Sequence, residues 1–226
     1  MDWSAIRTSL LERGFALTGP LLGEDDCASL IRAYDDERVF RKRIAMARHG
    51  YGRGEYQYFA YPLPPLVDRL RHELFPRLSE VANEWAERSK LEERYPDTLD
   101  AYLERCHEAG QLRPTPLLLK YGVGDYNCLH QDLYGEQAFP LQLTVVLSEQ
   151  GGDFDGADFV LVEQRPRMQS RAEVVPLDRG DAVVWAVRSR PVKGTRGTYR
   201  VNMRHGVSRL RSGHRHTLGV IFHDAT

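Results

Sequence analysis

Apolar and polar residues follow two different periodicities along this chain of 226 residues. As far as about residue 113, the apolar residues recur every three or four positions, which is typical of amphipathic helices. From Leu117 onward they occur in short runs separated by turn residues, which is typical of β-strands. The pattern predicts one domain over residues 1–226, with a mostly helical part over 1–113 and a β-rich core over 114–226.

The first part is predicted to contain four helices and one short strand. Gly14 stands where the first helix ends, acidic residues at 24–26 favour the start of the second, and Pro64 and Pro65 precede the third. The predicted helices cover residues 3–13, 24 to about 34, 65 to about 85 with a kink at Pro76, and 98–108, and the strand covers residues 15–17.

The second part is predicted to contain a series of short strands, which indicates a β-sandwich or a barrel. The fold class is therefore mainly β with N-terminal helices. The predicted strands cover residues 117–121, 141–147, 159–162, 172–175, 182–187, 199–207 and 215–222.

The segment between Phe40 and Phe59 lacks helical periodicity and is rich in glycine, arginine and tyrosine. Glycine permits motion, while arginine and aromatic side chains grip or stack on flat groups. The segment is interpreted either as a substrate lid, with Arg53 and Tyr56 as candidate substrate-binding residues, or as a structural connection whose tyrosines close over the sandwich.

Composition narrows the class of protein further. Three cysteines without paired spacing favour neither a disulfide framework nor a zinc finger, and no basic leader or long apolar run is present, so we expect no membrane association and a cytoplasmic location. The net charge is −1, yet residues 161–226 hold 13 of the 31 Lys and Arg and only 5 of the 32 Asp and Glu. This asymmetry predicts a basic surface that attracts an anionic substrate, unless folding pairs these residues with the acidic ones.

A His-X-Asp triplet, His130-Gln131-Asp132, carries the strongest chemical signal. Side chains two residues apart in an extended chain project to the same face, so the imidazole and the carboxylate can bind one metal ion. Together with a second histidine they would form the facial triad of a non-haem Fe(II) oxygenase, which leaves the opposite positions open. The alternative interpretation is an ion-paired surface couple without a metal.

The third ligand is expected among the histidines of the last strands. Such an oxygenase also needs a cation to hold the distal carboxylate of 2-oxoglutarate, and arginine does this with two parallel hydrogen bonds. Arg215 follows His205 by ten positions, and a turn at Ser212-Gly213 returns the chain toward the same place. No basic residue stands at that distance after His214 or His216, so the sequence predicts His205 as the ligand.

These residues resemble the iron and 2-oxoglutarate sites of prolyl-4-hydroxylase-like oxygenases. Four longer strings are also similar to a bacterial family commonly described as AlkB-like and acting on alkylated nucleic acid. One departure is Gly156-Ala157-Asp158-Phe159, where family members usually show Gly-Gly-Glu-Phe. The four strings cover residues 127–135 (NCLHQDLYG), 163–171 (EQRPRMQSR), 204–207 (RHGV) and 218–225 (LGVIFHDA).

The resemblance implies a double-stranded β-helix, the cupin-like jelly roll, with helices on its flank. His130, Asp132 and His205 would bind Fe(II), Arg215 would bind 2-oxoglutarate, and O2 would take the last position. Hydroxylation of a substrate C–H bond would be coupled to decarboxylation of 2-oxoglutarate to succinate. Tyr121 and Asn127 are candidate hydrogen-bond donors to the cosubstrate or to a ligand, and each has a packing or turn role as its alternative.

The substrate is less defined than the metal site. Arg165, Arg167 and Arg171 form a basic block suited to phosphates or carboxylates, and a further basic rim is expected from Arg188, Arg190, Lys193, Arg196 and Arg200. Three functions are weighed: oxidative demethylation of alkylated, single-stranded nucleic acid; hydroxylation of a protein side chain or an anionic metabolite; and metal binding by a cupin-like protein without catalysis. A pI near 6.7 argues against tight non-specific binding to nucleic acid. The sequence does not define an oligomeric state.

Overall fold

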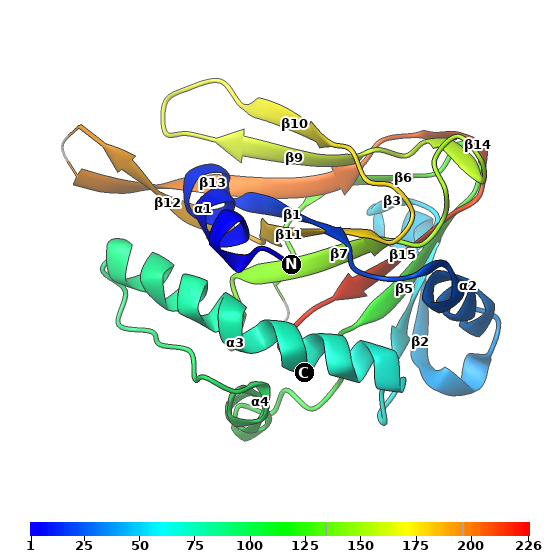
Figure 1. Cartoon of the computed structure of the whole chain (residues 1–226), viewed down its shortest axis with the longest axis horizontal. Coiled ribbons are helices and arrows are strands. Elements are labelled where there is room, and N and C mark those ends of the chain that lie inside the picture. Colours follow the sequence, from blue (N-terminus) through cyan, green and yellow to red (C-terminus); the bar gives the residue numbers. More distant parts are fainter. Residues whose placement is uncertain (134, 196) are drawn as a thin grey trace.

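A computed structural model describes residues 1–133, 135–195 and 197–226 (Figure 1). Its larger sheet has seven strands in the described chain, and all its neighbours are antiparallel. In spatial order they are β1 (Phe15–Pro20), β11 (Asp181–Ala186), β7 (Leu141–Val146), β15 (Arg215–Val220), β5 (Leu117–Tyr121), β4 (Glu55–Phe59) and β2 (Phe40–Ala45).

A second antiparallel sheet lies against the first and is drawn above it in Figure 1. Its order is β10 (Arg171–Val175), β9 (Phe159–Gln164), β13 (Gly197–Val207), β6 (Tyr126–His130) and β3 (Gly52–Arg53), and β12 (Ser189–Gly194) also pairs with β13. A small pair, β8 (Phe154–Gly156) with β14 (Leu210–Gly213), stands at one end of the molecule.

The two sheets enclose an apolar core. Phe159 and Leu161 from β9 pack with Val183 and Trp185 from β11, in the alternation expected when one face of a strand is buried. All residues of β7 are buried, because helices cover the other side of the larger sheet. Two facing antiparallel sheets with a flank of helices confirm the predicted class, mainly β with a jelly-roll core.

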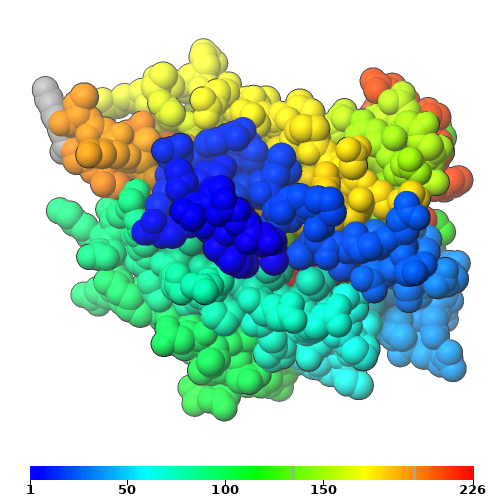
Figure 2. All heavy atoms as spheres, viewed as in Figure 1, coloured from blue at the N-terminus to red at the C-terminus, as the bar shows by residue number. Residues whose placement is uncertain are grey.

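The helices pack on the outer face of the larger sheet. Pro65 opens α3, where a missing backbone N–H costs nothing, and α3 continues through Pro76. The dark blue N-terminal segment fills the front of the molecule between the yellow strands and α3 (Figure 2). The helices are α1 (Trp3–Arg13), α2 (Glu24–Ala33), α3 (Pro65–Arg88) and α4 (Leu99–Glu108), with short 3₁₀ turns η1 (Glu37–Val39) and η2 (Met46–His49).

The predicted helices and the predicted strands of the β-rich part are present, with small shifts at their ends. The segment between Phe40 and Phe59 differs from a free lid, because it contributes β2 and β4 to the larger sheet and β3 to the smaller one. Strand alternation around the His-X-Asp triplet predicts that Cys128 is buried, but it is exposed. No helix in the described residues is long and apolar enough to cross a membrane. The single domain over residues 1–226 stays a prediction.

Candidate metal centre

Two neighbouring strands of the smaller sheet bring two histidines together. His205 on β13 is the register partner of His130, the last residue of β6, and their ring centroids are 4.0 Å apart. The pairing slips between His205 and Val207, where a Cβ on Gly206 would lie 2.8 Å from the carbonyl oxygen of Asn127. A glycine is therefore needed at position 206 for β13 to approach β6 this closely.

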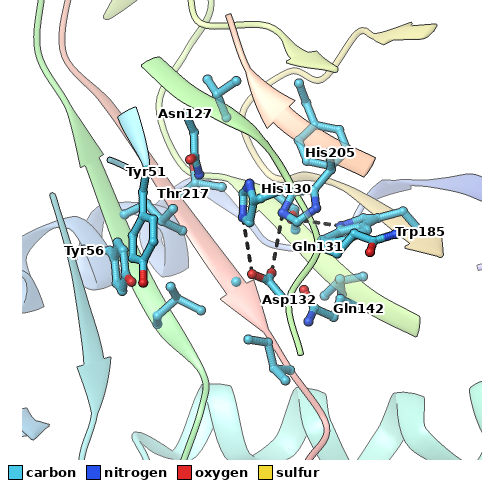
Figure 3. Close-up of a pocket in the computed structure, with 18 of the residues that line it drawn as sticks. Tyr51, Tyr56, Asn127, His130, Gln131, Asp132, Gln142, Trp185, His205 and Thr217 are labelled. Carbon is cyan, nitrogen blue, oxygen red and sulfur yellow. Dashed lines mark hydrogen bonds and ion pairs between the residues drawn. The ribbon is translucent and has the colours of Figure 1, made fainter. Parts of the chain in front are cut away.

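Asp132 follows β6 and completes the cluster (Figure 3). Its Oδ1 lies 3.3 Å from Nε2 of His130, and its Oδ2 lies 3.5 Å from Nε2 of His205. One ligand atom from each of the three residues lies within 4.8 Å of the others, and they form the candidate metal group found in the described chain. Two imidazoles and one carboxylate on one side of a cavity are the donor set of a facial triad, so the residues fit Fe(II).

Both histidines are oriented by their neighbours. Nδ1 of His130 lies 2.7 Å from the Cys128 carbonyl, which can only accept a hydrogen bond, so Nδ1 donates to it and Nε2 faces Asp132. Burial lowers the pKa of His130, but its hydrogen bond to Asp132 and the Asp132 charge outweigh burial, and the pKa is raised overall. Burial lowers the pKa of His205 to about 3, so its ring is neutral near pH 7.

Trp185 fixes the second imidazole by packing. Its ring centroid is 3.9 Å from that of His205, and its Nε1 donates a hydrogen bond of 3.2 Å to Oγ1 of Thr144. The indole therefore cannot turn away without losing a buried hydrogen bond. Trp185 is not among the residues predicted from the sequence, because a single tryptophan in an apolar strand gives no functional signal.

Arg215 lies in the same cavity as the three candidate ligands. It is the first residue of β15, opposite Tyr121 on β5, and only 2% of it is exposed. Its Nη1 is buried without a hydrogen-bond partner in the described chain, and burial lowers the pKa of the guanidinium. A buried charge without a partner is costly, so this site is suited to an anionic ligand.

Further polar groups around Arg215 complete the cavity. Thr217 stands two residues later on the same face of β15, and Gln142 belongs to the fully buried strand β7. Oγ1 of Thr217 and Nε2 of Gln142 are buried without hydrogen-bond partners among residues that the structure describes. Neither residue is among the candidates predicted from the sequence, although Thr217 stands two positions after Arg215 and Gln142 is a polar residue within an apolar strand.

The cavity has a volume of about 290 Å³ and opens beside two tyrosines. Tyr56 lines it from β4, and Tyr51, half of whose surface is exposed, lines it just before β3 (Figure 3). Gly52 lets this corner pack against β6, because a Cβ there would lie 2.3 Å from the Tyr126 carbonyl oxygen. The glycine-rich segment thus forms one wall of the cavity.

Tyr121 and Asn127, the two candidate donors, both line the cavity. Burial raises the pKa of Tyr121 to about 12, so its hydroxyl stays protonated and can donate a hydrogen bond. Arg53, in contrast, does not line the cavity, and its Nε lies 3.8 Å from Oδ1 of Asp125.

The arginines predicted to bind substrate lie outside this cavity. Nε of Arg165 lies 2.8 Å from Oε1 of Glu163, Nη2 of Arg171 lies 3.7 Å from the same atom, and Arg167 is exposed. Arg190 is buried, not part of a basic rim, because its Nη2 pairs with Oε2 of Glu163 at 2.5 Å. The expected rim residues Arg188, Lys193 and Arg200 are at least partly exposed, and Arg196 lies outside the described residues.

The family that this sequence matches consists of oxygenases, which agrees with the candidate metal site. Residues 54–225 match the model of a family described as oxygenases catalysing oxidative methylation of damaged DNA. An uncharacterised protein of Mycobacterium tuberculosis is 48% identical over 194 residues, which cover 84% of this chain and 83% of that protein.

Solved structures share the fold at low sequence identity. A prolyl-4-hydroxylase from Pseudomonas putida is 14% identical with a TM-score of 0.58, and 99% of each chain is covered. An oxidoreductase of the 2OG-Fe(II) oxygenase family from Burkholderia pseudomallei is 12% identical with a TM-score of 0.57, covering 100% of this chain and 93% of that one. At these identities the likeness concerns the fold.

The predicted enzyme class is therefore confirmed at the level of the family. The predicted Fe(II), 2-oxoglutarate and O2 agree with that family, with the fold and with the donor set of the cavity. The match over residues 54–225 means that the chain belongs to this family of oxygenases.

Proposed function

We propose that the protein uses Fe(II), 2-oxoglutarate and O2 to hydroxylate an N-methyl group of an alkylated nucleic acid base. The observation that carries this proposal is the presence, in one cavity, of the His130, Asp132 and His205 group and of the Arg215 guanidinium, whose buried Nη1 has no hydrogen-bond partner among the described residues. A metal ion neutralises the first, and a dicarboxylic cosubstrate neutralises the second.

His130, Asp132 and His205 are the proposed metal ligands. The carboxylate faces Nε2 of both histidines at 3.3 and 3.5 Å. The two histidines come from neighbouring strands of one sheet and Asp132 follows two residues after His130, which leaves the cavity side of the ion free. Bound there with 2-oxoglutarate and O2, iron would supply the oxidant that breaks a substrate C–H bond, while 2-oxoglutarate becomes succinate and carbon dioxide.

Arg215 is the proposed partner of the distal carboxylate of 2-oxoglutarate. Its fork suits two parallel hydrogen bonds, and the Thr217 hydroxyl and Tyr121 hydroxyl lie in the same cavity as additional donors. Tyr121 and Phe154 place their ring centroids 5.8 and 5.7 Å from the guanidinium carbon, so the charge is shielded from water. Such a site holds the cosubstrate in one orientation with its other end toward the ligands.

The tyrosines at the opening suit a flat substrate. Half of Tyr51 is exposed, and its ring stacks on His49 with centroids 5.3 Å apart, which leaves an aromatic surface beside the cavity. Enzymes that act on a base commonly extrude it and hold it against aromatic side chains. Hydroxylation of an N-methyl carbon gives an unstable hydroxymethyl group, which is released as formaldehyde. The family description, which concerns damaged DNA, supports this substrate class.

The proposed function is tested by measuring whether succinate and formaldehyde form in equal amounts. Wild-type protein with Fe(II), 2-oxoglutarate and a single-stranded oligonucleotide containing N-methylated adenine should form succinate and formaldehyde in equal amounts, and His130→Ala should form neither. A broader set of substrates, including peptides and a metabolite extract, runs in parallel. Succinate coupled to stable hydroxylation of a peptide or metabolite, with none coupled to the oligonucleotide, would replace the proposed substrate and keep the metal assignment.

A further inference from the structure

A second cavity, of about 220 Å³, lies next to the metal cavity. Leu133 lines both of them, so the segment that carries Asp132 forms their shared wall. Gln131 fixes this wall, because its Nε2 donates hydrogen bonds of 3.0 Å to the Arg188 carbonyl and 2.7 Å to the Met203 carbonyl. The metal ligands and the start of the β12–β13 ribbon are therefore held together as one unit.

The ribbon, defined as Arg188 with β12 and β13, carries arginines that have no carboxylate partner in the described chain. Arg188 and Arg200 line the second cavity, and Arg204, four residues after Arg200 on β13, points to the same face as Arg200. All three are exposed, and within residues 1–133, 135–195 and 197–226 no carboxylate lies within ion-pair distance of them. This sets them apart from Arg165, Arg171 and Arg190, which converge on Glu163.

Apolar and acidic side chains line the rest of the second cavity, which suits an organic group such as a nucleic acid base. Its walls include Trp85 and Leu91 at the end of α3 and beyond, and Pro191 on β12. Figure 1 shows this end of α3 below the free end of the ribbon, and Figure 2 shows the orange and teal atoms meeting there. Glu93 and Glu136 also line it, and their carboxylates can accept hydrogen bonds from amino groups of bases.

We propose that the β12–β13 ribbon binds the phosphates of a single strand next to the modified nucleotide, through Arg188, Arg200 and Arg204. The Arg204 side chain projects to the face of β13 opposite His205, and Arg200 lies four residues before it on that same face, about 13 Å along an extended strand. This spacing exceeds one base, so the ribbon would follow more than one nucleotide of a strand that leaves the metal cavity across Leu133. The proposal rests on the proposed function, since it assumes a nucleic acid in the metal cavity.

The experiment measures the binding of a labelled single-stranded oligonucleotide with a central N-methylated adenine, over a range of salt concentrations. Mn(II) replaces iron and oxygen is excluded, so that no turnover occurs. In the triple variant Arg188→Gln, Arg200→Gln, Arg204→Gln the slope of log affinity against log salt should become shallower by about 0.7 for each lost contact, roughly 2 in total. Replacing the same residues with lysine should largely restore the slope.

The matched control is Arg77→Gln, an exposed arginine on α3 that lies 3.4 Å from Glu80 and lines neither cavity. It should bind as wild type does. A second readout is turnover of the methylated nucleoside alone, which has no flanking phosphates. The triple variant should keep wild-type turnover of the nucleoside and lose efficiency only on the oligonucleotide.

Two contrary results are distinguishable. If wild type and the triple variant bind the oligonucleotide with the same affinity and the same salt slope while both demethylate it, the ribbon is excluded and the proposed function stands. If wild type neither binds nor demethylates the oligonucleotide, both the ribbon and the nucleic-acid substrate are excluded. Loss of nucleoside turnover in the triple variant also contradicts the proposal, because it would place these arginines in the metal site.

Discussion

Two of the buried arginines of this protein have different surroundings. Arg71, fully buried on α3, donates from Nε to the Ile221 carbonyl at 2.9 Å and pairs through Nη2 with Asp224 at 3.0 Å. Arg215, equally buried on β15, has aromatic rings around it and no carboxylate within ion-pair distance in the described chain. The first is satisfied by the protein, and the second is available to a ligand.

The Asp224 network explains why the first arginine is structural. Asp224 also accepts a hydrogen bond from the Tyr61 hydroxyl at 2.9 Å and lies 3.0 Å from Nε2 of His107, so one buried carboxylate joins α3, α4 and the end of the chain. Every partner is internal, and no anionic group is missing. A buried charge therefore indicates a binding site only when its partner is absent, which is the case for Arg215 and not for Arg71.

The largest expected effect is a difference in the free energy of unfolding between variants of Arg71 and of Arg215. Arg71→Met leaves Asp224 buried without its guanidinium partner and should lower the free energy of unfolding by about 3–5 kcal/mol. Arg215→Met removes an unpartnered buried charge and should leave the free energy of unfolding of the ligand-free protein unchanged or raise it. Urea denaturation of both variants measures the difference. Equal losses would mean that Arg215 has a structural partner after all.

The next effect concerns ligand binding. Without Arg215 the cavity cannot offer two charged hydrogen bonds, each contributing about 1.5–3 kcal/mol, so Arg215→Met should bind 2-oxoglutarate at least about 100-fold more weakly. Titration of the Mn(II)-loaded protein under nitrogen, followed by the rise in melting temperature, gives the dissociation constant. Metal affinity, measured without 2-oxoglutarate, should not change, since Arg215 is not among the proposed metal ligands.

The pH dependence of stability tests the protonation state of a buried histidine next to Asp224. Burial lowers the pKa of His223 to about 4, and Nδ1 of this ring accepts a hydrogen bond of 3.2 Å from the backbone N–H of Phe139, which requires a neutral ring. The unfolded chain takes up a proton near pH 6.5 and the folded chain does not, so stability is full above about pH 6.5 and falls as pH drops toward 4. The loss from this group at pH 4.5 should be roughly 2 kcal/mol.

His216 adds to the same trend, because burial lowers its pKa to about 4 as well. Free energies of unfolding measured from pH 7 to 4.5 should therefore decline, and the decline should be smaller in His223→Gln. A slope that is the same in wild type and His223→Gln would show that His223 is already protonated in the folded protein, or does not change its protonation on unfolding.

The smallest expected effect concerns Thr217 and its contribution to the binding of 2-oxoglutarate. Thr217→Val keeps the shape of the side chain and removes a buried hydroxyl that has no hydrogen-bond partner in the part of the chain described. If that hydroxyl donates to the cosubstrate, 2-oxoglutarate should bind about 2- to 12-fold more weakly, since one neutral hydrogen bond contributes 0.5–1.5 kcal/mol. The same titration measures it, and unchanged affinity would assign Thr217 to packing alone.

The sequence alone was sufficient to predict those residues of the candidate site whose side-chain directions depend on local strand geometry. His130 and Asp132 are two residues apart, and Arg215 follows a turn after His205, so strand alternation places each side chain on a definite face. Thr217 could have been found by the same rule. The helices before residue 113 and the strands after Leu117 also follow from periodicity, because each buries one face.

Other parts of the site depend on which elements become neighbours. Trp185, Gln142 and Tyr51 come from β11, β7 and the corner before β3, and no spacing in the sequence relates them to His205. The segment between Phe40 and Phe59 has the composition of a loop, yet the open edges of both sheets recruit it as strands. Hydrogen bonds between paired strands stabilise the extended conformation of this segment, and they outweigh its weak local preference for β-structure.

By itself, then, the sequence determined the candidate metal-binding triplet, the candidate distal histidine and the candidate cosubstrate arginine, since each is a matter of residue type and short-range alternation. Only the tertiary structure decided which charges are free. Arg165, Arg171 and Arg190 are held by Glu163, whereas Arg188, Arg200 and Arg204 are exposed without a carboxylate partner within the described residues. The physical reason is that a charge is neutralised by whatever lies within a few ångströms in space, and strands distant in sequence set those neighbours.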